Sequence, residues 1–255
     1  MEKSRIEQYR DFLKSIAWKQ VDFSATDQNR GAPVPPIEKP FAPDAKRMEL
    51  PRPQDPEALW EFGRGTDLAA AIANRCSRRS YRREPLTLEG LSFLLWATQG
   101  VRGKVTAGHA YRNVPSGGCR HALETYLAVL NVTGLEQGVY RYLPLSHQLV
   151  FEFAEASLEA RLVEATLGQA FVAKAAVTFV WAAIPYRMEW RYSLAAHKVI
   201  AIDAGHVCQN LYLACEAIGA GTCAIAAYDQ EALDRLLRLD GTDEFVIYLA
   251  PVGKR

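Results

Sequence analysis

The chain has 255 residues, of which 49% are hydrophobic and 23% are charged, the composition of an ordinary globular protein. Its 30 basic and 29 acidic residues leave a formal net charge of +1, which argues against a general nucleic-acid-binding protein. The longest apolar run, residues 175–185, is about half as long as a membrane span, and the N-terminus lacks the apolar stretch of a signal peptide.

The N-terminal part of the chain predicts a helix followed by an extended arm. Residues 3–18 have apolar side chains at helical spacing. Eight of the thirteen prolines lie within residues 21–56, which excludes a continuous helix or a central strand there. The apolar anchors that favour an ordered arm over a disordered linker are Phe23, Phe41, Leu50 and Trp60. We expect this helix and proline-rich arm to occupy residues 1–66, lying on the body or on a partner subunit.

A compact domain is expected over residues 67–255, with helices and strands that interleave without a regular βαβ repeat. Helices are predicted at residues 67–74, 87–98, 158–167, 187–218 and 230–239, with Asp67 and Thr87 as N-caps. Strands are predicted at residues 123–132, 138–142, 149–153, 176–184, 222–227 and 245–252. The strand at 176–184 is apolar on both faces, which predicts a buried position. This order favours an α+β fold.

Several familiar motifs are absent or stand in the wrong context. Residues 219–224 match GxGxxA, but here the order is helix, glycines, strand, which is the reverse of a dinucleotide fingerprint. We interpret these glycines as the end of the preceding helix. The five histidines have no ligand spacing with acids or cysteines, so no metal site is predicted. The five cysteines form no CxxC pair, and their odd number favours free thiols and a cytoplasmic location.

Five arginines stand within residues 75–83, with no acid among them. One interpretation is a solvated helix end, because basic side chains are favoured at a helix C-terminus. The other is an anion clamp, because Arg75, Ser77 and Arg79 alternate and would project to one side of an extended segment. The charge pattern by itself leaves both interpretations open.

Two further segments also allow two interpretations. The sequence Pro115-Ser116-Gly117-Gly118 is either a simple turn or a loop whose backbone approaches a flat ligand. The closing Lys254-Arg255 is either a charged tail or a second pair of phosphate contacts delivered by a buried strand.

In this order, the motifs resemble the FMN-dependent nitroreductase superfamily and, within it, the SagB-type dehydrogenases. The pattern R-x-S-x-R-x-[FY] is met at residues 75–81, and PS-[AG]-G-x-x-[HY]-x-x-E-x-Y is met at residues 115–126. The other matching segments are residues 91–100, 134–142, 203–214 and 251–254. Six motifs in register make the resemblance specific, and together they cover about residues 67–255.

The resemblance implies an α/β/α sandwich around a mostly antiparallel sheet, in a domain-exchanged homodimer with two FMN sites at the interface. It implies an FMN-dependent oxidoreductase that moves hydride by a ping-pong mechanism between a reductant such as NAD(P)H and a small-molecule or peptide substrate. Arg75 and Ser77, with Lys254 or Arg255, would bind the phosphate. Arg79 would face N1 and O2 of the flavin ring. The ring would be bordered by Pro115, Ser116 and Gly117, and its N5 would face the backbone N–H groups near Ala226 and Ala227.

The family pattern differs at one place that bears on the substrate. Azoline-oxidising members have a Lys-Tyr pair where this chain has Arg191 and Tyr192. Arginine holds its proton too tightly to be a good general base, while Tyr192 would be either a proton donor or a packing residue. The alternatives are therefore an azoline-to-azole peptide dehydrogenase working with a cyclodehydratase, and a non-catalytic module that binds flavin or peptide.

Overall fold

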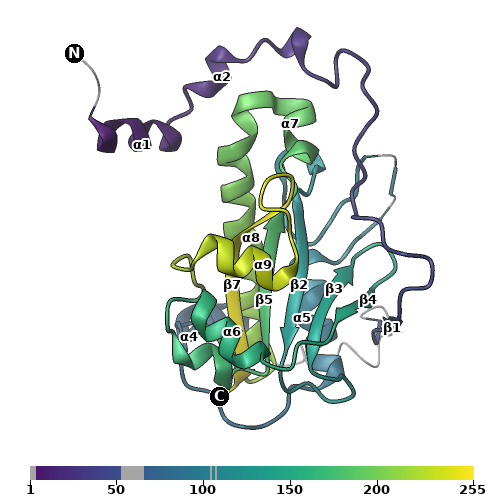
Figure 1. Cartoon of the computed structure of the whole chain (residues 1–255), viewed down its shortest axis with the longest axis vertical. Coiled ribbons are helices and arrows are strands. Elements are labelled where there is room, and N and C mark those ends of the chain that lie inside the picture. Colours follow the sequence, from purple (N-terminus) through teal and green to yellow (C-terminus); the bar gives the residue numbers. More distant parts are fainter. Residues whose placement is uncertain (1–3, 53–65, 104, 107) are drawn as a thin grey trace.

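The computed structural model describes residues 4–52, 66–103, 105–106 and 108–255 (Figure 1). Trp60, one of the anchors predicted for the arm, lies outside the described residues.

A seven-stranded sheet organises the molecule, and all of its strand pairs are antiparallel. Its order is β1-β4-β3-β2-β5-β7-β6. The strands are β1 (Arg47–Glu49), β2 (Leu123–Val129), β3 (Gly138–Leu143), β4 (Gln148–Phe153), β5 (Val177–Ala183), β6 (Ala220–Thr222) and β7 (Phe245–Lys254). The strand predicted from its apolar faces, β5, is buried along its whole length between β2 and β7. The mostly antiparallel sheet expected from the resemblance is confirmed.

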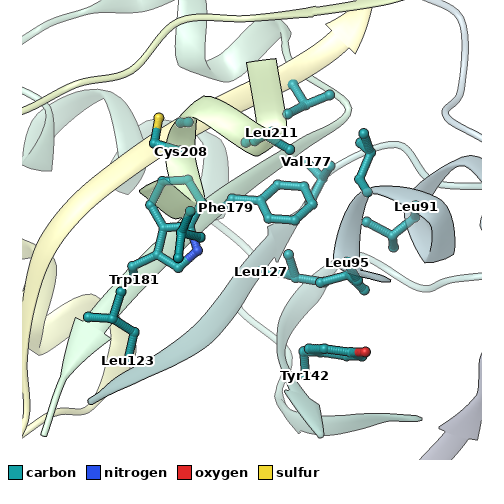
Figure 2. Packing of buried hydrophobic residues seen from close by; sticks show 14 of the residues in the cluster. Leu91, Leu95, Leu123, Leu127, Tyr142, Val177, Phe179, Trp181, Cys208 and Leu211 are labelled. Carbon is teal, nitrogen blue, oxygen red and sulfur yellow. The ribbon is translucent and has the colours of Figure 1, made fainter. Parts of the chain in front are cut away.

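Helices cover both faces of this sheet. The main helices are α4 (Leu68–Asn74), α5 (Leu88–Gln99), α6 (Leu158–Ala165), α7 (Tyr186–Tyr192), α8 (Ala196–Ala217) and α9 (Gln230–Leu237). On one face, Leu91 and Leu95 of α5 and Leu211 of α8 pack with Val177 and Phe179 of β5 (Figure 2). The other face packs against α6 and α9 in a second hydrophobic cluster. The predicted α+β class and the α/β/α sandwich are therefore confirmed.

Two predicted N-caps fix the starts of their helices. The side chain of Asp67 accepts a hydrogen bond from the N–H of Ala69 (3.0 Å), and Thr87 accepts one from Gly90 (3.1 Å). At the other end of α4, Arg75 is the C-cap and begins the arginine-rich segment.

Three of the predicted elements differ most from the structure. The helix expected at 187–218 is two helices, because Ser193 adopts a positive φ of 46° between α7 and α8. Apolar spacing continues across this break, so periodicity does not reveal it. The strand expected at 222–227 is β6, which covers Ala220–Thr222, and its ladder with β7 runs from Ala220 opposite Lys254 to Thr222 opposite Val252. The helix expected at 3–18 is α1 (Arg5–Leu13) followed by α2 (Ala17–Gln20).

The proline-rich arm runs down the side of the body to β1 (Figure 1). This short strand pairs with β4 at the edge of the sheet, and the sequence did not predict it. Buried arginines of the body hold its backbone. Arg112 donates to the carbonyl of Ile37 (2.9 Å), and Arg141 donates to the carbonyl of Lys39 (2.8 Å). The arm also donates to the body, because the N–H of Lys39 gives a hydrogen bond to Glu124 (2.8 Å).

Two further observations concern the helices and the cysteines. Within the described parts of the chain, no helix is both long and apolar enough to cross a membrane. All five cysteines are free thiols.

Candidate functional site

The arginine-rich segment follows α4 as extended backbone beside β6. Ser77 forms a parallel bridge with Thr222, and the N–H of Arg78 donates to the Thr222 carbonyl (2.9 Å). The Arg78 side chain packs against Gly221 of β6, and its Nε lies 4.0 Å from the carboxylate of Glu216. The extended segment that the alternation of Arg75, Ser77 and Arg79 required is therefore present.

Tyr212 of α8 contacts the beginning of the arginine-rich segment. Its hydroxyl lies 2.9 Å from the Ser77 hydroxyl and accepts a hydrogen bond from the N–H of Ala224 (2.8 Å). The guanidinium of Arg75 lies 5.3 Å from the centre of the Tyr212 ring. Sequence reasoning missed Tyr212, and only its place in the segment 203–214 could have indicated it.

The basic residues near this end differ in their partners. Arg255 pairs with the largely buried carboxylate of Glu216. Lys254, opposite Ala220 in the ladder of β6 and β7, donates to the carbonyl of Ile218 (3.2 Å). Among the described residues, no carboxylate pairs with Arg75, Arg79 or Lys254. Three of the four cations predicted for FMN are thus without a counter-ion, and Arg255 is neutralised.

Arg79 does not join the group at Tyr212. Its guanidinium lies 6.0 Å from the ring of Phe171, in the short helix whose N-cap, Gln169, donates to the carbonyl of Ala227 (2.9 Å). The N–H groups of Ala226 and Ala227 donate to no acceptor among the residues that the structure describes. The short helix of Phe171 is thus connected to Arg79 through Phe171 and to Ala227 through Gln169.

A cavity of about 500 Å³ adjoins Ala226. It lies between the first half of α8, the end of β5 and the start of β7. Its lining is Phe12, Ala183, Pro185, His197, Ile200, Ala201, Ala204, Gly205, Ala226, Phe245, Ile247 and Tyr248. The walls are mainly apolar, and Phe12 comes from the N-terminal helix α1. The cavity suits a flat, largely apolar group.

The glycine-containing loop forms a second group of predicted residues, away from the first. The Ser116 hydroxyl accepts from the N–H of His121 (3.0 Å), and the N–H of Gly117 donates to Asp203 (3.3 Å). Burial raises the pKa of this carboxyl group. Gly118 has a φ of 59°, and a Cβ there would lie 2.5 Å from the Tyr192 hydroxyl. Glycine is needed here because tyrosine packs against the backbone.

Tyr192 therefore lies with this loop rather than with the cations. Arg191 places its guanidinium 5.4 Å from the Tyr192 ring, and Trp18 of α2 packs against the same ring at 5.5 Å. Neither Arg191 nor Tyr192 lines the apolar cavity. Pro115, which precedes Ser116, is exposed.

The two groups lie on different sides of α8. Tyr212 and Asp203 are nine residues apart, which is about 2.5 turns, so their side chains leave the helix in opposite directions and about 13 Å apart along it. A single chain therefore brings Arg75, Ser77 and the cavity to one flank, and Ser116, Gly117 and Tyr192 to the other. No cluster of three or more metal-ligating side chains is found in the described parts of the chain.

Comparison with known sequences gives a consistent assignment. Residues 72–254 match the model of the nitroreductase family. A protein of Methanocaldococcus jannaschii that is named as a nitroreductase is 33% identical over 188 residues, 74% of this chain and 91% of that protein. The trifolitoxin-processing protein TfxB of Rhizobium leguminosarum bv. trifolii is 30% identical over 155 residues, which are 59% of this chain and 41% of TfxB.

Solved structures show the same architecture. A Ralstonia eutropha chain assigned to the nitroreductases has a TM-score of 0.67 at 26% identity, over 85% of this chain and 93% of that one. A chain of the Escherichia coli microcin synthetase McbBCD, solved with truncated pro-MccB17 bound, has a TM-score of 0.60. That likeness covers 100% of this chain and 98% of the other, and its 18% identity shows a shared fold.

Proposed function

This chain belongs to the nitroreductase family, and from that premise we propose that it is an FMN-dependent oxidoreductase. It would transfer hydride by a ping-pong mechanism between NAD(P)H and a small or peptidic organic substrate. We assign FMN binding to a domain of residues 67–255, joined to an arm of residues 1–66, in a cytoplasmic protein. The observations that support this most directly are a set of cations without carboxylate partners among the described residues and an apolar cavity that adjoins Ala226.

The phosphate of FMN suits the end of the site at Tyr212. Arg75 and Lys254 provide positive charge, and Ser77 provides a hydroxyl donor. Arg255 is the less suitable of the two C-terminal cations, because Glu216 already neutralises it. We therefore assign the phosphate to Arg75, Ser77 and Lys254.

The flavin ring suits the neighbouring stretch of chain. Bound FMN would supply the hydride chemistry, and the protein would orient and tune it. Arg79 would stabilise the negative charge that reduced flavin gains near N1 and O2. The free N–H groups of Ala226 and Ala227 match a hydrogen bond to N5.

The separation of the two groups across α8 supports a homodimer. A flavin held by Arg75 and Ser77 cannot also touch Ser116 and Gly117 of the same chain, because α8 lies between them. A second copy could bring its own loop to the ring. The exposed apolar side chains of Leu68, Ile72 and Ile202 on α4 and α8 give such a partner a surface to cover.

A second candidate function is azoline-to-azole oxidation of a peptide together with a cyclodehydratase. The similarity to TfxB, a trifolitoxin-processing protein, favours a peptide substrate. The Arg191 guanidinium, stacked beside Tyr192, argues against proton abstraction at that position because arginine keeps its proton. We therefore rank this candidate below the general reductase.

The test is flavin content and its reduction. Purified protein should be yellow, hold one FMN per chain, and bleach anaerobically with NADH or NADPH. The Arg75→Ala variant should weaken FMN binding by about 1.5–3 kcal/mol, the value of a charge-assisted hydrogen bond. Arg82→Ala is the matched control, since Arg82 is exposed and pairs with Glu84.

Other outcomes would contradict parts of the proposal. Colourless protein that cannot be reconstituted with FMN would identify a binding module instead. Yellow protein that no reductant bleaches would indicate flavin sequestration. Conversion of an azoline peptide to an azole, without NAD(P)H oxidation, would favour the second candidate.

A further inference from the structure

The apolar cavity has few groups that could move a proton. Only His197 and Tyr248 among its lining residues have ionisable side chains. Burial raises the pKa of Tyr248 to about 12, so its phenol keeps its proton at neutral pH. Tyr192, the tyrosine indicated by the sequence, does not line this cavity. The remaining candidate is an imidazole, the side chain best suited to proton transfer near pH 7.

His197 is held by a carboxylate from the neighbouring helix. Its Nε2 lies 2.7 Å from Oε1 of Glu189, which α7 positions just before the break at Ser193. In the described structure, Nδ1 of His197 has no hydrogen-bond partner. A carboxylate on one ring nitrogen fixes the tautomer and stabilises the imidazolium, which leaves the other nitrogen free to exchange a proton.

Several charged and titratable groups surround this pair. They are Asp27, Tyr186, Glu189, Lys198 and Tyr248. Asp27 accepts from the Tyr186 hydroxyl (2.9 Å), and Lys198 donates to the carbonyl of Leu13. Among these described groups, Glu189 is the one whose carboxylate hydrogen-bonds the His197 imidazole.

We propose that His197 is the proton-transferring residue of the cavity and that Glu189 is its positioning residue. This inference rests on the proposed function. Reduction of a quinone to a hydroquinone needs one hydride, which reduced FMN supplies when bound after oxidation of NAD(P)H, and one proton. As the imidazolium, His197 gives the proton on Nδ1 to the quinone oxygen, keeps the proton on Nε2 beside Glu189, and then regains a proton from solvent. The hydride and the proton together account for both electrons and both hydrogens that the quinone gains.

The test compares two acceptors with NADH or NADPH as the reductant. Menadione takes up two electrons and two protons, whereas ferricyanide takes up one electron and no proton. His197→Asn should lower kcat for menadione by about 100-fold, the usual scale of general acid catalysis, and leave ferricyanide reduction within about twofold. Glu189→Gln should lower menadione turnover by about tenfold, because it removes the charge and keeps the hydrogen-bonding shape. His109→Asn, an exposed histidine outside the cavity, is the matched control.

Equal losses with both acceptors, or unchanged menadione turnover, would overturn the inference. An independent measurement uses flavin-free protein and ¹⁵N NMR of the histidine rings. Menadione should shift the Nδ1 signal of His197 but not the ring signals of His109. A saturating addition of menadione that leaves His197 unmoved would exclude contact. Wild-type protein that reduces neither acceptor would instead contradict the proposed function, while the NMR result still decides the role of His197.

Discussion

His121 shows at the residue scale how burial sets a protonation state. The side chain is buried, adopts a φ of 46°, and hydrogen-bonds the carbonyl of Ala110 through Nε2 (2.8 Å). Burial, with Arg112 nearby, lowers its pKa from 6.5 to about 3. The folded protein therefore holds this imidazole neutral at pH values where the unfolded chain protonates it.

This lowered pKa predicts acid sensitivity. Between pH 6.5 and about 3 the unfolded state binds the proton and the folded state does not, so stability falls as pH falls. The contribution is about 1.4 kcal/mol per pH unit for one such group. His121→Asn, which can adopt a positive φ, should flatten the dependence of the unfolding free energy on pH between 6.5 and 4.5. Urea unfolding at several pH values measures this, and an unchanged slope relative to wild type would contradict it.

Gly118 gives a second prediction at the residue scale. Gly118→Ala should destabilise the protein by about 2–3 kcal/mol, because a Cβ would be 2.5 Å from the Tyr192 hydroxyl and the φ is positive. Tyr192→Phe removes that oxygen, so the double variant should recover part of the loss. A double-mutant cycle in urea measures the coupling, and strictly additive effects would show that the two residues do not touch.

At the scale of elements, the proline-rich arm is hydrogen-bonded to the body through the carbonyls of Ile37 and Lys39. Arg112→Met should release the arm near Ile37, since it removes a buried guanidinium that donates to that carbonyl and to Gln99 (2.8 Å). The expected loss is about 2–4 kcal/mol, together with faster proteolysis between residues 28 and 45. Arg235→Met, an exposed arginine of α9 that pairs only with Glu231 among the described carboxylates, is the control. Equal proteolysis of both variants would argue against this role of Arg112.

At the scale of the whole molecule, the separated site makes a prediction about subunits. Arg75→Ala removes a cation from one flank of α8, and Pro115→Glu places a charge on the other. If each FMN site uses one flank from each chain, neither variant alone should bind FMN well. Mixing them after unfolding and refolding should restore about a quarter of the wild-type sites, because half of the dimers are mixed and each has one intact site. No recovery, with dimers present by light scattering, would place each site within one chain.

Much of the fold could be predicted, because it depends on local signals. A few neighbouring residues are enough to predict the helix starts at Asp67 and Thr87. The same is true of β5, which is apolar on both faces. The break at Ser193 and the short length of β6 could not be predicted, since both depend on pairing and packing with residues distant in the chain. For the site, the motifs indicated Arg75 and Ser77, while Tyr212 and His197 became visible only through their neighbours.

The order of motifs by itself determined the family, the fold class and which cations to examine, because these follow from the types and spacing of nearby residues. Only the tertiary structure decided how those cations differ. Arg255 is neutralised because folding brings Glu216 to it, while Arg75, Arg79 and Lys254 meet no carboxylate in the described structure. The tertiary structure also decided that the loop at residues 115–118 is separated from these cations. That separation depends on which side of α8 each segment contacts, and no local sequence pattern specifies it.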